Sequence, residues 1–517
     1  MTPLRIRCVG RPLALAVALC LVGFGSAMGE EGPGGEDGAS VGRTAFAQKC
    51  AQCHGANGEG VKEEYEEPLF GELPVEELAG VIERTMPEGA PEECVGEEAR
   101  QIAAYMHGAF YSPAAREAAG IGTALRIELA RLTVPQYRNA VADVIGRFTP
   151  APKRAEEAEG EPAAGLVAEY FQSKGMSKAD ELKSEQIDAQ VDFDFGEGGP
   201  TSDIDVTQFA LIWSGSLVAK DTGDYEFRVT TENGARLYVN NDPSQRRGKL
   251  RDDSAAAGQA ALIDGWVSSG KRRELTARVF LLGGRRYPLR LEFFKYKEKT
   301  ASVRLEWKPP HGTWSVLDAQ HLVAEPSPRT FVVDTPFPAD DRSLGYERGS
   351  SVSRAWHEAT TNGAIATATE IVARLPLLAG YDEKTPDRDA RVREFLVQFA
   401  AAAFRRPLTE AETQLFRETL FADAPSPEAA VRRAVILVLT SPSFLYDDLT
   451  PAGEAPTQYA IAARLALGLW DSVPDAALVD AAANGRLASA EEIEAEARRM
   501  LDDPRAKAKL RAFFEHW

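Results

Sequence analysis

The chain has fewer basic than acidic side chains, and its C-terminal part lacks several familiar catalytic motifs. Its 517 residues include 78 acidic and 59 basic side chains, giving a formal net charge of −19. Such a balance disfavours broad electrostatic attraction to nucleic acid or to anionic lipid. The C-terminal part contains no G-x-G-x-x-G, no H-E-x-x-H and no serine nucleophile elbow, so these dinucleotide, zinc-protease and hydrolase sites are not indicated there. At this length we expect about three or four domains.

The apolar run at the N-terminus is too short to remain as a membrane span. Pro12 to Gly25 falls short of the roughly 20 residues that a spanning helix needs. Arginines precede the run and the small residues Gly25-Ser26-Ala27 follow it, which is the order of a cleaved export signal. We therefore expect residues 1–27 to be removed and residues 28–40 to form a flexible leader. The mature chain is expected to be exported, periplasmic or at the cell surface, with no transmembrane span.

Cysteine is scarce, and one pair lies in a recognisable pattern. Of the five cysteines, Cys8 and Cys20 fall within the export signal. Cys50-Ala51-Gln52-Cys53-His54 is the C-x-x-C-H signature of covalently attached haem c, in which two thiols form thioethers and the imidazole binds the iron. No second Cys/His pair accompanies it, which disfavours a zinc site. A single motif also argues against a di-haem peroxidase.

A second iron ligand is expected downstream of this motif. Met86 precedes Pro87 in a loop, where its thioether offers a neutral, soft ligand outside a packed helix face. Met106 and His107 are rivals, but Met106 continues a helical apolar spacing that predicts a buried position. With His54 and Met86 both bound, the iron has no open position, which favours electron transfer over oxygen or peroxide chemistry.

On these residues the segment 41–112 resembles the class I cytochromes c. The resemblance rests on the Met86-Pro87 loop, on Cys94-Val95-Gly96 and on a closing helix that contains Ile102-Ala-Ala-Tyr105. It implies an α-helical domain with one covalent haem c. Relatives often carry a second cysteine four residues after the first, where this chain has Glu98. Cys94 is therefore expected to be a buried, unpaired thiol.

The next two segments lead to a region with a different periodicity. Residues 113–149 predict a short helix that ends near Gly146, with Thr133 as its N-cap and Pro135 in its first turn. Residues 150–164 are rich in Pro, Ala, Glu and Lys, which is typical of a linker. Within residues 165–323 the apolar residues recur with a period of two, which predicts an antiparallel β-sandwich.

The block 165–323 resembles the protective-antigen (PA) domain. The resemblance rests on the stretches Gly165-Leu-Val-Ala-Glu-Tyr-Phe171, Phe209-Ala-Leu-Ile-Trp-Ser-Gly-Ser-Leu217, Thr222-Gly-Asp-Tyr-Glu-Phe227 and Glu232-Asn-Gly-Ala-Arg-Leu-Tyr-Val239. It implies a glycan ligand or a cell-surface role, with a spacer or docking domain as the alternative. Sugar-binding lectins of this type hold calcium on two adjacent acids. In the corresponding candidate sugar or calcium loop, Glu232 and Asn233 keep two oxygens but one charge, which argues against calcium.

The pattern becomes helical again after the sandwich. We expect residues 324–384 to connect and residues 385–517 to form an all-α domain, whose first helix follows Thr385-Pro386. Further helices are predicted at 427–440 and 457–470, with capping boxes at Thr409 and Ser489. The last helix carries an apolar stripe of Leu510, Phe513, Phe514 and Trp517 that runs to the final residue. A partner could cover this stripe, but we expect a chain that is cut short.

Several phrases together resemble the planctomycete-type exported multidomain cytochromes c. They are Tyr346-Glu-Arg-Gly-Ser-Ser-Val-Ser-Arg-Ala-Trp-His357, Ala403-Phe-Arg-Arg-Pro-Leu-Thr409, Ser441-Pro-Ser-Phe-Leu-Tyr446 and Ala463-Arg-Leu-Ala-Leu-Gly-Leu-Trp470. The resemblance implies a multidomain α+β architecture: an α-helical cytochrome c domain, an inserted PA-like antiparallel sandwich and helical domains of unknown function. It names no substrate.

Three hypotheses about function follow. The leading one is an exported mono-haem cytochrome that transfers electrons and is tethered to a glycan- or surface-binding sandwich. The second is an oxidoreductase whose helical region acts on a polysaccharide-derived substrate, with the haem as electron acceptor. The third is a surface adhesion or carbohydrate-binding protein. The sequence identifies no catalytic residue and no redox partner protein, and it predicts packing or surface positions for His357 and His516.

Overall fold

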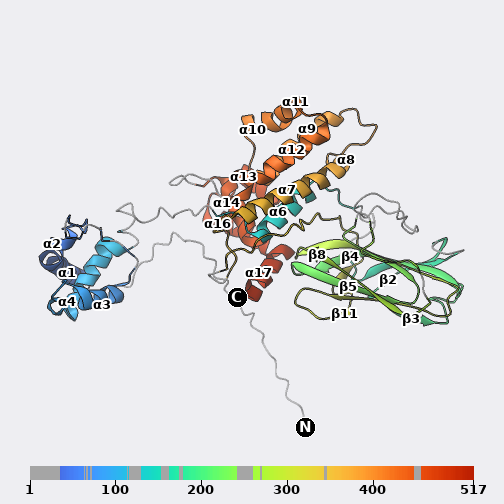
Figure 1. Ribbon diagram of the computed structural model, residues 1–517, viewed down its shortest axis with the longest axis horizontal. Helices are drawn as coiled ribbons and strands as arrows, with labels where there is room; N and C mark the ends of the chain where they lie inside the picture. Colours follow the sequence, from blue (N-terminus) through green and yellow to red (C-terminus); the bar gives the residue numbers. More distant parts are fainter. Residues whose placement is uncertain are drawn as a thin grey trace, which may run out of the picture. The chain divides into compact units, whose positions relative to one another are not determined.

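The computed structural model describes residues 35–62, 64, 65, 68, 69, 71, 73–112, 115, 130–152, 162–173, 179–241, 260–267, 270–342, 346–447 and 456–516 (Figure 1). The chain divides into two compact units, Met1–Arg126 and Ile127–Trp517. None of the described helices combines the length and the apolar character that crossing a membrane requires. The expected export signal, residues 1–27, lies outside the described residues.

The first unit is α-helical, as expected for residues 41–112. Its elements are α1 (Gly35–Lys49), α2 (Ala51–His54), α3 (Val75–Thr85), the short helix η1 (Pro91–Glu93), α4 (Glu97–Met106) and the π-helical turn η2 (His107–Tyr111). Their core gathers Phe46 from α1, Ile82 from α3 and Ile102 from α4. Met106 is buried in this core, so its predicted position is confirmed.

The second unit contains the predicted antiparallel sandwich. Its strands are β1 (Leu166–Gln172), β2 (Glu181–Asp188), β3 (Asp192–Gly196), β4 (Gln208–Ala219), β5 (Gly223–Thr231), β6 (Gly234–Val239), β7 (Ile263–Gly265), β8 (Arg273–Leu281), β9 (Arg285–Tyr296), β10 (Ala301–Lys308), β11 (Ser315–Val316) and β12 (Leu322–Val323). One sheet has the order β2-β1-β4-β9-β6-β7, with β12 paired to β4, and the other has β11-β10-β5-β8, with β3 paired to β10. Alternate residues such as Phe227, Val229 and Leu291 fill the space between the sheets, which is the origin of the period of two.

The two ends of the sandwich lie side by side. The backbone N–H of Gly165 donates to the carbonyl of Leu322 at 3.1 Å, and that of Ala324 donates to the carbonyl of Ala163 at 2.9 Å. Ala164 and Val323 form an antiparallel bridge between these bonds. The chain therefore enters and leaves the sandwich at one point.

The helices of the second unit lie on both sides of the sandwich in sequence. They are α6 (Val134–Gly146), α7 (Arg354–Ala373), α8 (Leu375–Leu378), α9 (Arg388–Phe404), α10 (Glu410–Gln414), η3 (Leu415–Thr419), α11 (Leu420–Ala422), α12 (Pro427–Thr440), α13 (Pro442–Leu445), α14 (Gln458–Trp470), α15 (Ala476–Ala483), α16 (Ala490–Leu501) and α17 (Pro504–His516). Tyr137 of α6 packs in the same cluster as Trp356 of α7 and Phe395 of α9. The sandwich is thus inserted into the sequence of a helical domain.

The expected connection at 324–384 contains a long helix. Helix α7 lies within it and buries small side chains such as Ala364 and Thr367. A Cβ at Gly363 would lie 3.0 Å from Oη of Tyr137 and 3.3 Å from Cγ1 of Val333. Gly363 of α7 therefore leaves room for the Tyr137 side chain of α6.

The helix ends follow local chemistry. The capping boxes at Thr409 and Ser489 are confirmed, and Thr133 forms a third with Gln136. Helix α9 begins at Arg388, later than the Thr385-Pro386 start that we expected. The carboxylate of Asp382 accepts hydrogen bonds from the Lys384 N–H at 2.9 Å and from the Thr385 hydroxyl at 2.8 Å. These bonds hold the stretch before the helix in a turn.

One buried ionic cluster joins the sandwich to the helices of the second unit. Asp143 of α6 accepts hydrogen bonds from Arg285 of β9 and from Arg505 of α17, the latter at 2.8 Å. The hydroxyl of Ser472 donates to the same carboxylate at 2.6 Å. Burial alone would raise the pKa of Asp143, but the two guanidinium groups lower it to about 2. We refer to Asp143, Arg285, Arg505 and Ser472 as the Asp143 cluster.

Candidate haem site and sandwich loop

The C-x-x-C-H motif occupies a single helical turn. Cys50 is the N-cap of α2, and the N–H of His54 donates to the carbonyl of Cys50 at 2.9 Å. Residues three and four positions apart lie on the same face of a helix. The turn therefore presents Cys50, Cys53 and His54 together, as a shared attachment site requires.

His54 is buried, and its ring environment favours the neutral form. The side chain is 9% exposed, and its Nδ1 is buried without a hydrogen-bond partner among the described residues. The Tyr65 ring packs edge-on with its centroid 4.6 Å from that of the imidazole. Burial lowers the pKa of His54. A neutral imidazole has a free lone pair, which is the form that binds a metal. The contact with Tyr65 was missed in the sequence because that residue lies in a loop without periodicity.

Cys50 is not an activated thiol. Burial raises the pKa of Cys50 to about 11, and the nearby Cys94 adds to the effect. Cys94 is buried, as we expected. Redox-active cysteines need a lowered pKa, because the thiolate is the reactive form. The environment of Cys50 therefore argues against a redox-active motif.

Glu98 forms an ion pair across two helices of this unit. Its carboxylate binds Lys49 at 2.8 Å, and Nζ of Lys49 also donates to the carbonyl of Glu93 at 2.7 Å. These contacts connect the residue before Cys50 to the segment that contains Cys94. An ion pair therefore joins α1 to α4.

Met86 lies just beyond α3, in the loop setting that we predicted. Its backbone is extended, and its N–H donates to the carbonyl of Ile82 at 2.9 Å. The half-buried side chain packs against the same core cluster as Cys50. A neutral imidazole, a thioether and two thiols form a donor set that fits covalently attached haem, which supplies one-electron chemistry when bound.

The candidate sugar or calcium loop is occupied by internal hydrogen bonds. Asn233 is fully buried, accepts from the N–H of Ser302 at 3.2 Å and donates to the carbonyl of Thr300 at 3.2 Å. Glu232 is 8% exposed and accepts from the hydroxyl of Ser302 at 2.5 Å. Among the described residues no group of three or more His, Cys, Asp or Glu side chains could hold a metal ion. The loop joins β5 of one sheet to β6 of the other, and its side-chain oxygens are used within the fold.

Four family descriptions match the chain in sequence order. "Cytochrome C oxidase, cbb3-type, subunit III" matches residues 37–106, and "PA14 domain" matches residues 162–320. "Protein of unknown function (DUF1595)" matches residues 391–447, and "Protein of unknown function (DUF1592)" matches residues 457–517. These matches agree with the multidomain arrangement that the sequence phrases indicated.

Individual relatives match about a third of this chain. The anti-sigma-I factor RsgI3 of Acetivibrio thermocellus is 25% identical over 161 residues, which are 31% of this chain and 22% of that protein. The chain thus spans about a fifth of that relative. Among solved structures, an anti-sigma factor domain-containing protein from Clostridium clariflavum is 21% identical, with a TM-score of 0.26, over 34% of this chain and 51% of that one. The PA14 sugar-binding domain from an RTX adhesin is 17% identical, with a TM-score of 0.22, over 31% of this chain and 99% of that one.

Proposed function

Since the chain joins a cytochrome c domain to a PA14 domain and to two regions of families without a known function, we propose that it is an exported mono-haem c-type cytochrome that transfers electrons. In this proposal the thiols of Cys50 and Cys53 bind haem through thioethers, and His54 and Met86 are the axial ligands. The observation that carries it is the placement of Cys50, Cys53 and a buried, neutral His54 on one helical turn.

The protein groups around the site support electron transfer over catalysis at the iron. Two axial ligands leave no position for a substrate. Phe46, Tyr105 and Phe110 pack together in the same core, with ring centroids 5.4 to 5.9 Å apart, and give it an aromatic, apolar character. Export agrees with the composition of residues 1–27 and with covalent haem attachment, which in bacteria takes place outside the cytoplasm.

The axial assignment is tested by the reduced and oxidised spectra of the exported protein. The Met86→Ala variant should lose the low-spin spectrum of a His/Met haem, because it removes only the thioether. Met106→Leu is the matched control, because Met106 fills the core. The spectrum of this variant should be that of the wild type. A His/Met spectrum that survives in Met86→Ala would refute the assignment of Met86.

For the sandwich we propose glycan or surface docking that localises the cytochrome. The chain matches the PA14 family, which includes the sugar-binding domain of the RTX adhesin. Binding of the full protein to a glycan array should be seen without reduction of its oxidised haem. Reduction of the haem by a bound glycan would instead favour the oxidoreductase hypothesis. If the protein binds glycans and its haem exchanges no electrons with other cytochromes, the adhesion hypothesis is favoured.

A further inference from the structure

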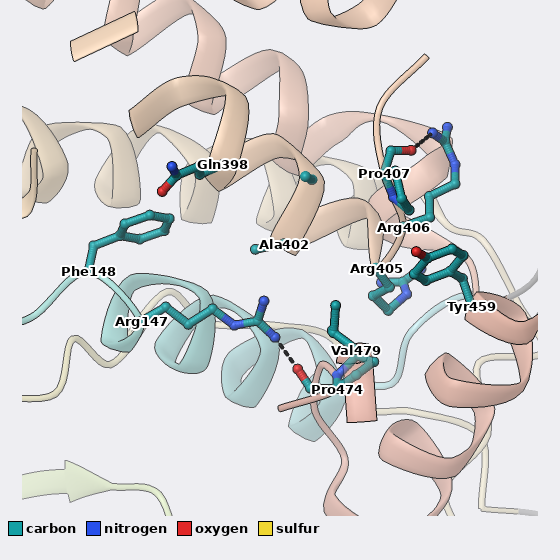
Figure 2. A pocket seen from close by; sticks show the side chains of 11 residues that line it. Arg147, Phe148, Gln398, Ala402, Arg405, Arg406, Pro407, Tyr459, Pro474 and Val479 are labelled. Carbon is teal, nitrogen blue, oxygen red and sulfur yellow. Dashed lines mark hydrogen bonds between the residues drawn. The ribbon is translucent and has the colours of Figure 1, made fainter. Parts of the chain in front are cut away.

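A cavity of about 410 Å³ lies within the helical domain of the second unit (Figure 2). Its lining comes from the end of α6, the C-terminal half of α9, the start of α14 and the segment that leads into α15. The residues are Arg147, Phe148, Gln398, Ala401, Ala402, Arg405, Arg406, Pro407, Tyr459, Pro474 and Val479. This volume falls in the range of about 300–1,000 Å³ that small-molecule sites occupy.

The cavity combines apolar walls with positive charge. Phe148, Ala402, Pro474 and Val479 supply apolar surface, and the described residues that line it include three arginines but no aspartate or glutamate. Figure 2 shows the side chain of Arg147 extending along the cavity toward Pro474, with Phe148 and Ala402 on the other side. The three arginines differ in how their charge is balanced.

Arg405 is a buried charge that is held by backbone carbonyls. It is 5% exposed, and its terminal nitrogens donate to the carbonyls of Phe444 and Ser443, each at 3.1 Å, and of Tyr446 at 2.5 Å. Burial lowers the pKa of Arg405 to about 10, although Asp447 attracts the charge. The guanidinium is therefore fixed in place, and its main hydrogen-bond partners are neutral.

Arg406 and Arg147 have different surroundings. Arg406 forms two hydrogen bonds with the carboxylate of Glu412, at 2.8 and 2.9 Å, so its charge is neutralised. Arg147 is exposed and donates one hydrogen bond to the carbonyl of Pro474. Most of its N–H groups therefore remain for another acceptor.

The carboxylates nearest to Arg147 are already bound elsewhere. Asp143 and Asp475 attract its charge. Asp143 accepts from Arg285 and Arg505, and Asp475 accepts two hydrogen bonds from Arg499 at 2.9 and 3.1 Å. The cavity therefore keeps an excess of positive charge.

We propose that this cavity binds a small organic acid, with its carboxylate on Arg147 and its apolar body against Phe148, Pro474 and Val479. The planar guanidinium matches a carboxylate through two parallel hydrogen bonds. Arg405, which also lines the cavity, adds a fixed positive charge that attracts the carboxylate. The apolar walls favour an acid with a hydrocarbon part over inorganic phosphate. This site is independent of the haem and of the proposed electron transfer.

Titration calorimetry of the full protein with benzoate tests the proposal. Benzoate should bind, whereas benzamide, which has the same ring without the charge, and inorganic phosphate, which has no apolar part, should not. The Arg147→Gln variant should weaken benzoate binding by about tenfold or more, because it removes a charged, bidentate partner. Arg432→Gln, an exposed arginine of α12 outside the cavity, should bind like the wild type.

Thermal unfolding of both variants checks that the fold is unchanged, which we expect because both arginines are exposed. The comparison of benzoate with benzamide on the wild-type protein does not depend on any variant. The proposal is wrong if benzoate does not bind, if benzamide binds equally well, if phosphate alone binds, or if Arg147→Gln leaves benzoate affinity unchanged.

Discussion

Replacing Asp143 by asparagine should weaken the junction between the sandwich and the helical domain. The substitution keeps the shape of the side chain but removes the charge that faces Arg285 and Arg505. Asp143 is 15% exposed and the two arginines are 12% and 17% exposed, so water screens the lost interaction only in part. Arg285 would then keep Oδ1 of Asn139 as its acceptor, and Arg505 would keep its ion pair with Asp503.

The pKa of Asp143 gives the size of the effect. A carboxyl whose pKa falls from 3.8 to about 2 contributes roughly 2–3 kcal/mol to the free energy of unfolding at neutral pH. Breaking a buried ion pair by removing one partner costs about 3–5 kcal/mol. Because asparagine can keep one hydrogen bond, we expect a loss of about 3 kcal/mol.

The pH dependence follows from the direction of the shift. The pKa is lower in the folded state, so the stabilisation is complete above pH 4 or so and is lost as the pH falls toward about 2. The difference between the wild type and Asp143→Asn should therefore shrink over this window. Other carboxylates titrate there too, but they do so in both proteins.

Urea unfolding that is followed by tryptophan fluorescence measures the effect. Trp470 is buried, and the guanidinium of Arg505 lies 4.0 Å from its ring, so this residue reports on the junction. Glu358→Gln breaks the exposed helical pair with Arg354 and should leave the midpoint near that of the wild type. Equal midpoints for Asp143→Asn and Glu358→Gln, or a difference from the wild type that does not change between pH 6 and 2, would refute the reasoning.

Two further substitutions test packing and capping. Gly234→Ala should lower the free energy of unfolding of the sandwich by about 1–3 kcal/mol or more, since its Cβ would lie 1.9 Å from Cε1 of Phe294. Gly146→Ala is the control, because its Cβ would meet nothing within 4 Å. Equal urea midpoints for the two variants would count against the close contact. Thr133→Ala should lower the free energy of unfolding by about 1 kcal/mol, because it removes the acceptor for the Gln136 N–H. Thr133→Ser should restore the wild-type midpoint. A wild-type midpoint for Thr133→Ala would show that the cap contributes nothing.

Features that depend on neighbouring residues were predictable from the sequence. The C-x-x-C-H pattern is visible in the sequence because Cys50, Cys53 and His54 lie within five consecutive positions, and their attachment of haem stays a prediction. The capping boxes at Thr409 and Ser489 are also local, since each bonds to an N–H three residues away. The period of two in β5 and β10 revealed the sandwich because one face of each strand meets the core.

Features that depend on distant residues were missed. Helix α7 buries mostly alanine, threonine and glycine, with large apolar residues at Trp356 and Ile371 near its two ends, so it shows little helical periodicity. The Asp143 cluster joins residues separated by 142 and 362 positions, and nothing near Asp143 in the sequence indicates either arginine. The cavity beside Arg147 is equally hidden, because its lining comes from segments that only the fold brings together.

The paired ends of the sandwich have a consequence for how the helical domain closes. A folded insert whose first and last strands are hydrogen-bonded presents its host with two chain ends a few ångströms apart. The inserted block is more than 150 residues long. Because its ends lie close together, the chain entropy lost when α6 and α9 form their shared core is about that of closing a short surface loop. The sandwich could therefore be exchanged for another module with adjacent ends while α6 still reaches its place beside α9.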